Sequence, residues 1–360
     1  MATIRNLESK YLHIPLGKGR GGSGATGVDF ILVEMTSSDG LIGTGFTFAL
    51  TGGGTSVKTY LDDTAAPVVL NTKLQEWDKH WHTLWDKHQR MGNGNGLLAL
   101  SAIDIAVWDI RAKEQNLPLY HLLGAQRETM PIYGSGRATH GMTTTELIEG
   151  ALSYKEEGYR AIKLRAGALG IAKDVKRIQA VREAVGDDFD IMVDCNERLT
   201  YPEALQLGRH LEELNIYWME EPLPAGDING HQRLAEQLRI PIAVGEHLHG
   251  RFEFVNYIKQ NAASIFQPDV PLVGGISEWN RIANITEGHG YVLTPHFLPE
   301  FHIQLGLSAK NCISIEHFPL IDDILLETLQ IENGVAIPPN RSGHGLQWDR
   351  EKIDYYQKLL

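Results

Sequence analysis

The stretch Phe189-Asp190-Ile191-Met192-Val193-Asp194 is a run of buried-strand residues that ends on a carboxylate, and the chain repeats this arrangement twice. Glu220 follows Ile216-Tyr217-Trp218-Met219, and Glu246 follows Ile240-Pro241-Ile242-Ala243-Val244-Gly245. Glu220 lies 26 residues after Asp194, and Glu246 lies 26 residues after Glu220. An equal step of strand, helix and strand brings the three carboxylates to neighbouring points on one rim of a parallel barrel. Because like charges repel unless a cation neutralises them, this spacing predicts a site for a hard divalent ion such as Mg²⁺, which prefers oxygen ligands.

The alternation of strand and helix continues on both sides of these carboxylates. From Pro131 onward, short apolar strands alternate with amphipathic helices such as residues 143–157, 173–185 and 202–214. Eight strands at a near-constant step predict a parallel α/β barrel of the TIM type. An open doubly wound sheet is the structural alternative, but it usually has fewer units. The predicted strands are residues 131–133, 161–165, 191–194, 217–220, 242–244, 264–267, 292–294 and 313–315.

The beginning of the chain follows a different pattern. Residues 28–35 and 41–48 read as two strands around a turn, which indicates an antiparallel meander, and residues 56–123 show helical periodicity. We therefore expect an α+β unit over residues 1–125 and a barrel over residues 126–325. The remaining segment, residues 326–360, is expected to pack back on the first unit.

The glycine-rich segment between residues 3–14, which partly alternate, and the strand at residues 28–35 contains GxGxxG at Gly17, Gly19 and Gly22. A dinucleotide-binding fingerprint requires a helix to begin at the third glycine, whereas a strand follows here. We interpret the segment as a loop whose basic residues, Lys18 and Arg20, contact an anionic substrate.

Composition restricts the partners of the chain. Hydrophobic content of 42% and charged content of 22% are ordinary for a globular protein. A net charge of −12 argues against nucleic acid and anionic membranes as partners, because nothing neutralises their phosphates. No apolar stretch approaches the ~20 residues of a membrane helix, and the N-terminus lacks the apolar core of a signal peptide. The two cysteines, Cys195 and Cys312, lie in apolar runs as small buried residues, so a cytoplasmic location is expected.

The carboxyl ends of the strands are where barrels of this type place their functional groups. Any single polar residue there is more often a helix cap or a surface group, and we assign Glu221 and Asp190 to that class. Seven groups of chemistry-bearing residues at matching positions on seven successive strands favour a shared active site. In chain order these are Lys163 with Arg165, Asp194, Glu220, Glu246, Asp269, His296 and Glu316.

The residue types at these positions suit the removal of a weakly acidic proton. A metal ion held by carboxylates accepts a substrate carboxylate and stabilises the enolate formed when the adjacent carbon loses its proton. His296 is the preferred base, and Asp269 is placed to fix its tautomer. Arg165 stays protonated, and beside its charge we expect the pKa of Lys163 to be lowered, so that Lys163 either binds the substrate carboxylate or acts as a second base. Glu316, if protonated, donates a hydrogen bond to the enolate oxygen.

These residues and the motifs around them resemble the mandelate racemase subgroup of the enolase superfamily, also called the mandelate racemase/muconate lactonizing enzyme family, over essentially the whole chain. The resemblance implies a modified (β/α)7β barrel with an N-terminal α+β capping domain that the C-terminal tail completes. It implies one Mg²⁺ bound by Asp194, Glu220 and Glu246, a His296–Asp269 dyad, loops at residues 15–27 and 49–54 that close over the substrate, and a homo-oligomer of two to eight subunits. The matching stretches are residues 102–109, 163–165, 193–196, 218–222, 245–246 and 268–269, followed by Gly274-Gly275, His296 and Glu316.

One position departs from the family's racemase pattern. That pattern has lysine at both ends of the Lys163-Leu164-Arg165 motif, whereas here Arg165 replaces the second lysine. A single histidine base suits the loss of the C2 proton of a sugar acid followed by loss of the C3 hydroxyl, with His296 or another acid protonating the leaving group. We therefore expect a hydro-lyase, an acid-sugar dehydratase that converts an aldonate or aldarate to a 2-keto-3-deoxy acid. Candidate contacts to the substrate are Lys18, Arg20, Asn196 and His247, with Arg165, His249 and Arg251 as weaker ones.

Three alternatives stay open at this point. A racemase, epimerase or cycloisomerase would act on a similar hydroxy acid through the same enolate. A non-catalytic protein would keep the site only to bind a sugar acid. An unrelated metal-dependent hydrolase usually draws on several histidine ligands, whereas only carboxylates occupy the metal positions here.

Overall fold

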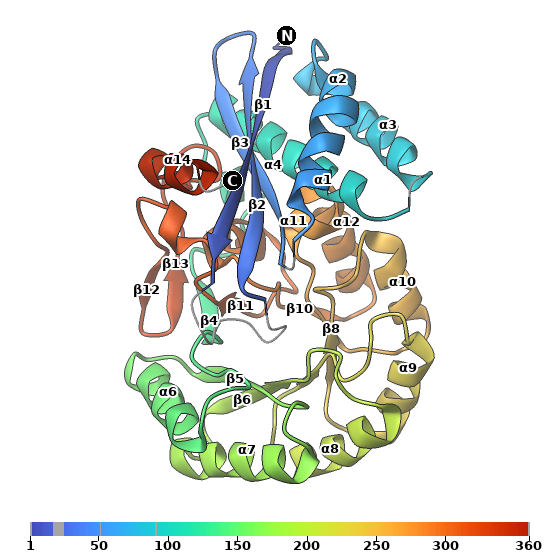
Figure 1. The fold of residues 1–360 in the computed structure, drawn as a ribbon, viewed down its shortest axis with the longest axis vertical. Helices are drawn as coiled ribbons and strands as arrows, with labels where there is room; N and C mark the ends of the chain where they lie inside the picture. Colours follow the sequence, from blue (N-terminus) through green and yellow to red (C-terminus); the bar gives the residue numbers. More distant parts are fainter. Residues whose placement is uncertain (1, 17–24, 51, 91, 359–360) are drawn as a thin grey trace.

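The computed structural model describes residues 2–16, 25–50, 52–90 and 92–358. Figure 1 shows a narrow sheet with helices beside it at the top of the molecule and a ring of strands and helices below it. The upper sheet is antiparallel, in the order β1-β2-β3, and Ile31 in its middle strand pairs with Tyr11 on one side and Thr47 on the other. Its strands are β1 (Ile4–Pro15), β2 (Gly27–Ser37) and β3 (Ile42–Ala49).

The long helix α4 (Asn95–Glu114) packs closely against β3 because two positions of that strand have no side chain. A Cβ on Gly43 would lie 2.3 Å from the carbonyl oxygen of Ala106, and one on Gly45 would lie 2.0 Å from that of Ala102. Helix α4 is apolar on nearly every side because it also contacts the barrel helices α11 (Val270–Val273) and α12 (Gly275–Gly288). The other short helices of this unit are α1 (Gly54–Tyr60), the π-helix η1 (Leu61–Ala65), α2 (Ala66–Val69), the 3₁₀-helix η2 (Leu74–Glu76), α3 (Trp77–Gln89) and α5 (Leu119–Leu122).

The lower part of the molecule contains seven parallel strands, β4 to β10, that neighbour one another in sequence order. The eighth strand, β11, pairs with β4, and a single bridge between Leu293 and Cys312 connects it to the β10 side. The ring is therefore barrel-like, with one side joined only by that bridge. The strands are β4 (Met130–Gly134), β5 (Ala161–Arg165), β6 (Asp190–Asp194), β7 (Met219–Glu220), β8 (Ile242–Val244), β9 (Ile265–Phe266), β10 (Val292–Leu293) and β11 (Ile315–His317).

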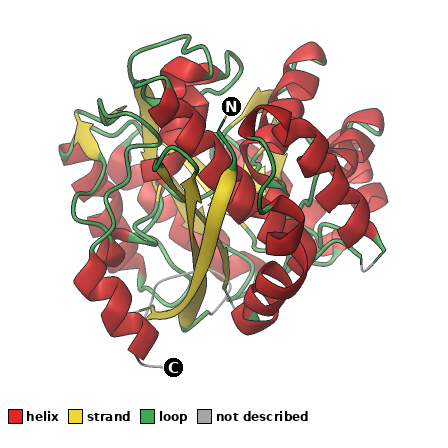
Figure 2. Ribbon diagram, turned by 90° about the horizontal axis from the view of Figure 1, so that it is seen from above, coloured by secondary structure: helices red, strands yellow, loops and turns green. Residues whose placement is uncertain are grey.

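Helices follow the first seven of these strands and lie on the outside of the ring, as Figures 1 and 2 show. Local sequence fixes several of their starts; Thr143, for example, forms a capping box with Glu146. In addition to α11 and α12, they are α6 (Thr144–Glu156), α7 (Ile171–Val185), α8 (Tyr201–Glu213), α9 (Ile228–Gln237), α10 (Arg251–Lys259) and α13 (Pro299–Ser308).

The interior of the ring is filled by a layer of mostly apolar side chains from successive strands. Ala161, Met192 and Trp218 belong to this layer. Because side chains on a strand alternate with period two, the residues two positions later, Lys163, Asp194 and Glu220, face the same interior one layer nearer the carboxyl ends. The apolar layer thus fills the barrel interior beneath a polar layer of side chains.

The end of the chain returns to both parts of the molecule. The short 3₁₀-helix η3 (Asp322–Ile324) leads to a hairpin of β12 (Gln330–Glu332) and β13 (Val335–Ile337), and β13 pairs antiparallel with β4. The last helix, α14 (Arg350–Lys358), contacts β1. Trp348 packs against the rings of Phe30 and Phe46, and its Nε1 donates to Oγ1 of Thr44 at 2.9 Å.

The fold class predicted from sequence is confirmed: an α+β capping domain stands over a modified TIM-type barrel of eight strands and seven interleaved helical segments. Cys195 and Cys312 are buried free thiols, as predicted. Among the described residues, no helix is long and apolar enough to cross a membrane.

Candidate active site

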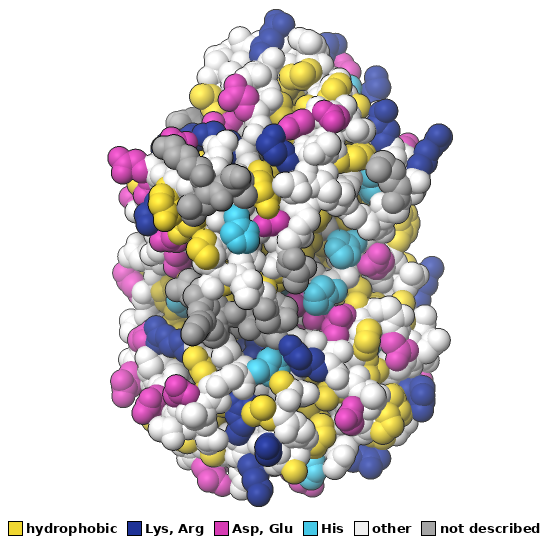
Figure 3. All heavy atoms as spheres, in the orientation of Figure 1, with side chains coloured by type: hydrophobic (Ala, Val, Ile, Leu, Met, Phe, Trp, Pro, Cys, Tyr) yellow, Lys and Arg dark blue, Asp and Glu magenta, His cyan; other side chains and the backbone are white. Residues whose placement is uncertain are grey.

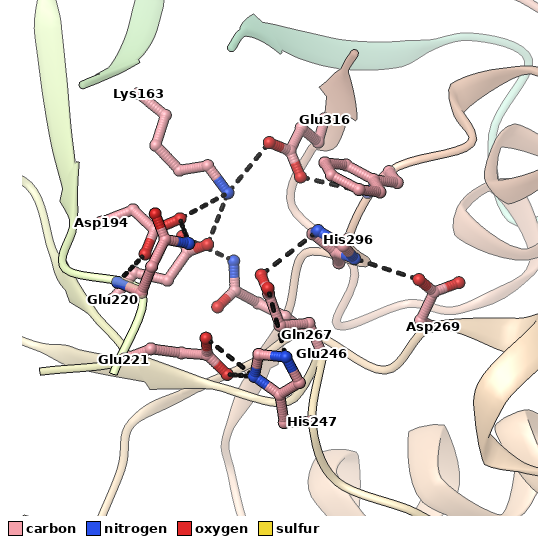
Figure 4. A network of polar contacts seen from close by, with 12 residues as sticks. Lys163, Asp194, Glu220, Glu221, Glu246, His247, Gln267, Asp269, His296 and Glu316 are labelled. Atoms are coloured by element: carbon pink, nitrogen blue, oxygen red, sulfur yellow. Dashed lines mark hydrogen bonds and ion pairs between the residues drawn. The ribbon is translucent and has the colours of Figure 1, made fainter. Parts of the chain in front are cut away.

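The three equally spaced carboxylates meet at the carboxyl ends of β6, β7 and β8. Asp194 and Glu220 end their strands, and Glu246 lies two residues after β8. One oxygen of each lies within 4.8 Å of one of each of the others, and all three side chains are buried. Figure 4 shows them together with the residues that contact them.

Neighbouring polar groups orient two of these carboxylates. The backbone N–H and the side-chain amide of Asn196 donate to the two oxygens of Asp194, at 2.8 and 3.0 Å. Trp218 Nε1 and Gln267 Nε2 both donate to Oε2 of Glu220, at 2.9 and 2.8 Å. We did not predict the contacts of Trp218 and Gln267, although both side chains share the inward face of their strands with functional residues.

The donor set fits a hard divalent cation. Burial, together with the charges of Glu221 and Glu220, raises the pKa of Glu246 to about 8, which shows how unfavourable three clustered carboxylates are without a neutralising charge. Oε2 of Glu246 is buried and makes no hydrogen bond among the described residues. All the candidate ligand atoms are carboxylate oxygens, the donors that Mg²⁺ prefers.

A histidine and an aspartate lie on the opposite side of Glu246 from the other two carboxylates. His296 Nδ1 is 3.0 Å from Oδ2 of Asp269, and its Nε2 is 3.2 Å from Oε2 of Glu246. Burial lowers the pKa of His296 well below its ordinary value and raises that of Asp269 well above. Contact of Nδ1 with Asp269 leaves Nε2 directed at the carboxylate cluster, the orientation that a base acting there requires.

A second buried histidine, His302, holds the two loops that carry this pair. Its Nδ1 contacts the carbonyl oxygen of Phe297 at 2.8 Å, and its Nε2 accepts the backbone N–H of Val270 at 3.1 Å. The same Nε2 lies 3.8 Å from Oδ1 of Asp269. Because Nε2 accepts, Nδ1 carries the proton, and burial lowers the pKa of His302 to about 4, which keeps the ring neutral. Its place one turn into an apolar helix gave no sign of this role in the sequence.

The pKa of Lys163 shifts in the opposite direction to the one expected from sequence. Its Nζ lies 2.5 Å from Oε1 of Glu220 and 2.9 Å from Oε1 of Glu316. Burial acts to lower the pKa of Lys163, but the charges of Glu220 and Glu316 outweigh burial and the opposing effect of Arg165, so the pKa is raised. The predicted lowering was wrong because Arg165 is not the nearest charge.

Glu316 is ionised rather than protonated in this arrangement. Burial acts to raise its pKa, but Lys163, His296 and Arg165 lower it to about 2. Its Oε2 accepts the backbone N–H of Phe297 at 3.1 Å, so Glu316 connects the lysine to the loop that carries His296. Arg165 forms an ion pair with Oδ2 of Asp194.

A second histidine–carboxylate pair borders the cluster. His247 Nδ1 lies 2.9 and 3.1 Å from the two oxygens of Glu221, and its Nε2 lies 4.0 Å from Oε1 of Glu246. Glu197 is 3.6 Å from the same Nδ1. The assignment of Glu221 to the surface class was wrong, because its side chain is 2% exposed and faces this histidine.

The backbone next to these side chains is unusual. Asn196, Glu197, Glu221, Phe297 and Leu298 all have positive φ, between 40° and 59°, and all follow strands of the barrel. A non-glycine residue in this region costs on the order of 1–3 kcal/mol and persists where the surrounding structure imposes it. Such strain at five positions around one cluster is characteristic of a functional site.

The remaining predicted contacts divide into three groups. Asn196 supports Asp194 and also approaches Nε2 of His140 at 3.3 Å. Lys18 and Arg20 lie outside the described residues. Arg251 forms an ion pair with the buried Glu278 at 2.5 Å, which is a packing role away from the carboxylates. On the face shown in Figure 3, histidine and acidic side chains gather near the middle, where the upper and lower parts of the molecule meet.

Family models match most of the chain. Residues 12–124 match the N-terminal domain of mandelate racemase and muconate lactonizing enzyme, and residues 146–352 match the enolase C-terminal domain-like model. The chain belongs to the mandelate racemase/muconate lactonizing enzyme family of the enolase superfamily. The resemblance inferred from the motifs is thereby confirmed.

Several characterised members of this family are similar to the chain. It is 36% identical over 321 residues to an L-talarate/galactarate dehydratase of Salmonella typhimurium, a match that covers 89% of this chain and 80% of the relative. The crystal structure of that dehydratase with Mg and L-lyxarohydroxamate superimposes with a TM-score of 0.94 at 33% identity, covering 99% of this chain and 93% of the other.

Two further relatives are named for two different reactions, a dehydration and a cycloisomerisation. An arabinonate dehydratase of Saccharolobus solfataricus is 31% identical, with 88% of both chains covered. A 3,6-anhydro-alpha-L-galactonate cycloisomerase of Streptomyces coelicolor is 29% identical, with 90% of both chains covered. Dehydratases therefore predominate among these relatives, and a cycloisomerase stands beside them.

Proposed function

We propose that this protein is an Mg²⁺-dependent acid-sugar dehydratase that converts an aldonate or aldarate to a 2-keto-3-deoxy acid and water. The observation that carries the proposal is the His296–Asp269 pair directed at the carboxylate cluster, while Arg165 occupies the position of the second base and pairs with Asp194. One base removes one proton from one face of the substrate. That arrangement favours elimination over racemisation by two opposed bases.

The roles of the residues follow from their positions. Asp194, Glu220 and Glu246 would hold Mg²⁺, which when bound supplies positive charge that acidifies the carbon next to the substrate carboxylate. His296 Nε2 takes the C2 proton, and Asp269 stabilises the resulting imidazolium through Nδ1. Lys163, held between Glu220 and Glu316, presents a fixed cation to the negative charge that develops on the substrate. The C3 hydroxyl then leaves as water, and the enol product becomes the 2-keto-3-deoxy acid.

The proposal is tested by incubating the purified protein and Mg²⁺ with a panel of aldonates and aldarates in deuterated water. We expect a 2-keto-3-deoxy product from at least one acid and none after treatment with EDTA. His296→Asn should abolish both the product and the exchange of the C2 proton, because the base is gone. Recovery of substrate inverted at C2 without any keto product would instead identify a racemase or epimerase. A protein that binds these acids without changing any of them would be the non-catalytic binder.

A second candidate is a ring-opening cycloisomerase, favoured by the similarity to the Streptomyces coelicolor enzyme. The same base would remove the C2 proton of an anhydro sugar acid, and the ring oxygen at C3 would leave while staying attached through its other carbon. The two reactions differ in mass: dehydration lowers the mass of the organic product by one water, whereas ring opening leaves it unchanged. Mass spectrometry of the product separates them.

The quaternary structure proposed from the family resemblance is a homo-oligomer. Exposed large apolar side chains such as Phe252 and Leu326 are available for contacts between copies. Light scattering coupled to size-exclusion chromatography should give a multiple of the 40.1 kDa chain mass.

A further inference from the structure

The loop that follows the first barrel strand contributes a histidine to the edge of the site. Strand β4 ends at Gly134, and residues 135–143 lead from it to α6. Nε2 of His140 in this loop lies 3.3 Å from Oδ1 of Asn196, whose Nδ2 donates to Oδ2 of Asp194 at 3.0 Å. The imidazole is therefore one side chain away from the carboxylate cluster. The reaction proposed above gives it no role.

The other ring nitrogen of His140 has no partner. Its Nδ1 is buried and makes no hydrogen bond among the described residues, although the residue as a whole is only partly buried. Buried polar atoms without a partner are rare in folded proteins, and each calls for an explanation. Two of the others, Oε2 of Glu246 and Oε1 of Gln267, also belong to this site. Unpaired atoms gathered in one place indicate that a polar ligand pairs with them.

The ring of His140 lies away from the base. Asn196, which the ring contacts, follows β6, whereas His296 follows β10. These two strands are four positions apart in the ring of eight, so they stand on opposite sides of it. An acid bound at the carboxylates therefore has His296 on one side and His140 on the other. Because the side chain of Asn196 separates His140 from Asp194, the imidazole is placed for a part of the acid beyond the two carbons that react.

The chemistry of a sugar acid fits this nitrogen. Carbons of such an acid beyond C3 carry hydroxyls, and a hydroxyl can both donate and accept, so it satisfies Nδ1 in either tautomer of the ring. A carboxylate can only accept. A hydroxyl contact also depends on stereochemistry, because inverting the configuration at a carbon moves its hydroxyl away from the ring.

We propose that His140 is a specificity-determining residue whose Nδ1 binds one hydroxyl of the acid beyond C3, on the side of the substrate away from His296. The proposal rests on the dehydration proposed above and adds recognition of substrate configuration to it. An acid that lacks this hydroxyl, or carries it in the inverted configuration, leaves Nδ1 unpaired. A site built to pair with a hydroxyl rejects the analogue without it, because the buried polar atom then has no partner. The loop after β4 thus selects among acids that the carboxylate cluster and His296 treat alike.

Two substitutions separate the nitrogens of the ring. The amide oxygen and nitrogen of asparagine stand two bonds from Cβ, as Nδ1 does, whereas those of glutamine stand three bonds away, as Nε2 does. His140→Gln therefore keeps a polar group for Asn196 and removes the one at Nδ1, and His140→Asn does the reverse. His210→Gln is the control, since His210 is 43% exposed on the outer helix α8. Mg²⁺ titration by calorimetry checks that the carboxylate cluster is intact in each variant.

The measurement is kcat/KM for the acid that wild type dehydrates and for analogues that each lack one hydroxyl beyond C3. Product formation by wild type is established first, so failure of the proposed function is seen before any comparison. For one analogue, we expect wild type to lose about fivefold or more in kcat/KM, the effect of leaving a buried polar group unpaired. His140→Gln should lose as much on the complete acid and nothing further on that analogue, because both changes break the same contact. His140→Asn should keep most of the preference for the hydroxyl, and His210→Gln should match wild type.

Two results would overturn the proposal. In the first, His140→Gln discriminates against every analogue as strongly as wild type does, so that recognition of no hydroxyl depends on the ring. In the second, His140→Asn loses activity equally on all acids and binds Mg²⁺ more weakly while His140→Gln is unaffected, which would show that the ring only holds Asn196 beside Asp194.

Discussion

Arg165 stands where the family's racemase pattern has a second lysine. Its substitution tests whether this difference prevents epimerisation of the substrate. A guanidinium stays protonated, whereas an ammonium can lose its proton and act as a base. Arg165→Lys places such a group opposite His296 on the inward face of β5. We expect the variant to release the C2 epimer of the substrate, measured by chromatography of recovered acid, with dehydration reduced.

Arg165→Met serves as the control for that prediction, since it removes the positive charge without adding a base. It should lower activity and produce no epimer. Equal amounts of epimer from the Lys and Met variants, or from wild type, would show that the second base is another group.

The residues proposed as metal ligands and base could be singled out from sequence because each is one polar residue at the end of a regular apolar run. Glu221 could not, because a carboxylate beside a metal ligand looks like a surface residue until the turn after β7 is known to have positive φ. The direction of the pKa shift of Lys163 was also predicted wrongly, and Glu316 does not meet the condition of being protonated under which it would donate. The pKa values of Lys163 and Glu316 depend on each other's charge. The two residues are in contact across the barrel although they lie more than 150 positions apart in sequence.

At the level of elements, α13 connects the two loops that carry the His296–Asp269 pair. His302 in this helix contacts the backbones of Phe297 and Val270. His302→Leu should lower kcat by about tenfold or more with little change in KM, because the base is misplaced while the metal cluster that binds the acid stays intact. His302→Gln, which retains a donor and an acceptor, should recover part of the loss. Parallel falls in kcat and in binding of Mg²⁺ by both variants would contradict this positioning role.

The contact between α4 and α12 predicts how the stability of the protein depends on pH. Asp104 is fully buried and accepts from Trp77 Nε1 at 2.7 Å and from Ser277 N and Oγ at 2.8 and 2.6 Å. Burial nevertheless raises its pKa from 3.8 to about 6. Because the folded pKa is the higher one, the folded state binds the proton more tightly. The stability that the protonated carboxyl provides is complete below pH about 4 and is lost as pH rises to about 6.

Asp104→Asn removes this proton linkage. The free energy of unfolding of wild type minus that of the variant should fall by about 3 kcal/mol between pH 3 and pH 7 and stay level above, at 1.36 kcal/mol per pKa unit. Urea denaturation at a series of pH values measures the difference, in which other titrating groups cancel. A difference that is flat or rises with pH would contradict the assignment.

The strand positions were predicted closely because buried parallel strands are short apolar runs between turn residues. The observed strands are shorter at the far side of the ring, where β9 and β10 contain two residues each. Regular pairing there depends on how long neighbouring strands stay side by side, which the arrangement of the whole ring determines rather than local sequence. The π-helix η1 was likewise not predicted, since its sequence has an ordinary helical pattern.

For the whole molecule, the order of the parts and the return of residues 326–360 to the first unit are expected from sequence, but the contacts that secure this return are not. Trp348 is 7% exposed and lies 5.9 and 5.8 Å, centre to centre, from the rings of Phe30 and Phe46 in the capping sheet. The tail that carries it also supplies β13, which pairs with the barrel strand β4. These contacts join residues more than 200 positions apart, so no local pattern predicts them. One segment therefore contacts both the capping sheet and the barrel.

Trp348→Ala tests this coupling. Loss of a buried tryptophan that also donates to Thr44 should lower the free energy of unfolding by about 3–5 kcal/mol, measured by urea denaturation. Tyr355→Ala, on the same tail but 57% exposed, is the control and should change stability by less than about 0.5 kcal/mol. If the tail holds the cap in place, the Trp348 variant should also lose affinity for the acid while its Mg²⁺ affinity stays unchanged, because the metal ligands belong to the barrel alone. Unchanged affinity for the acid in a destabilised variant would show that the tail adds stability without positioning the cap.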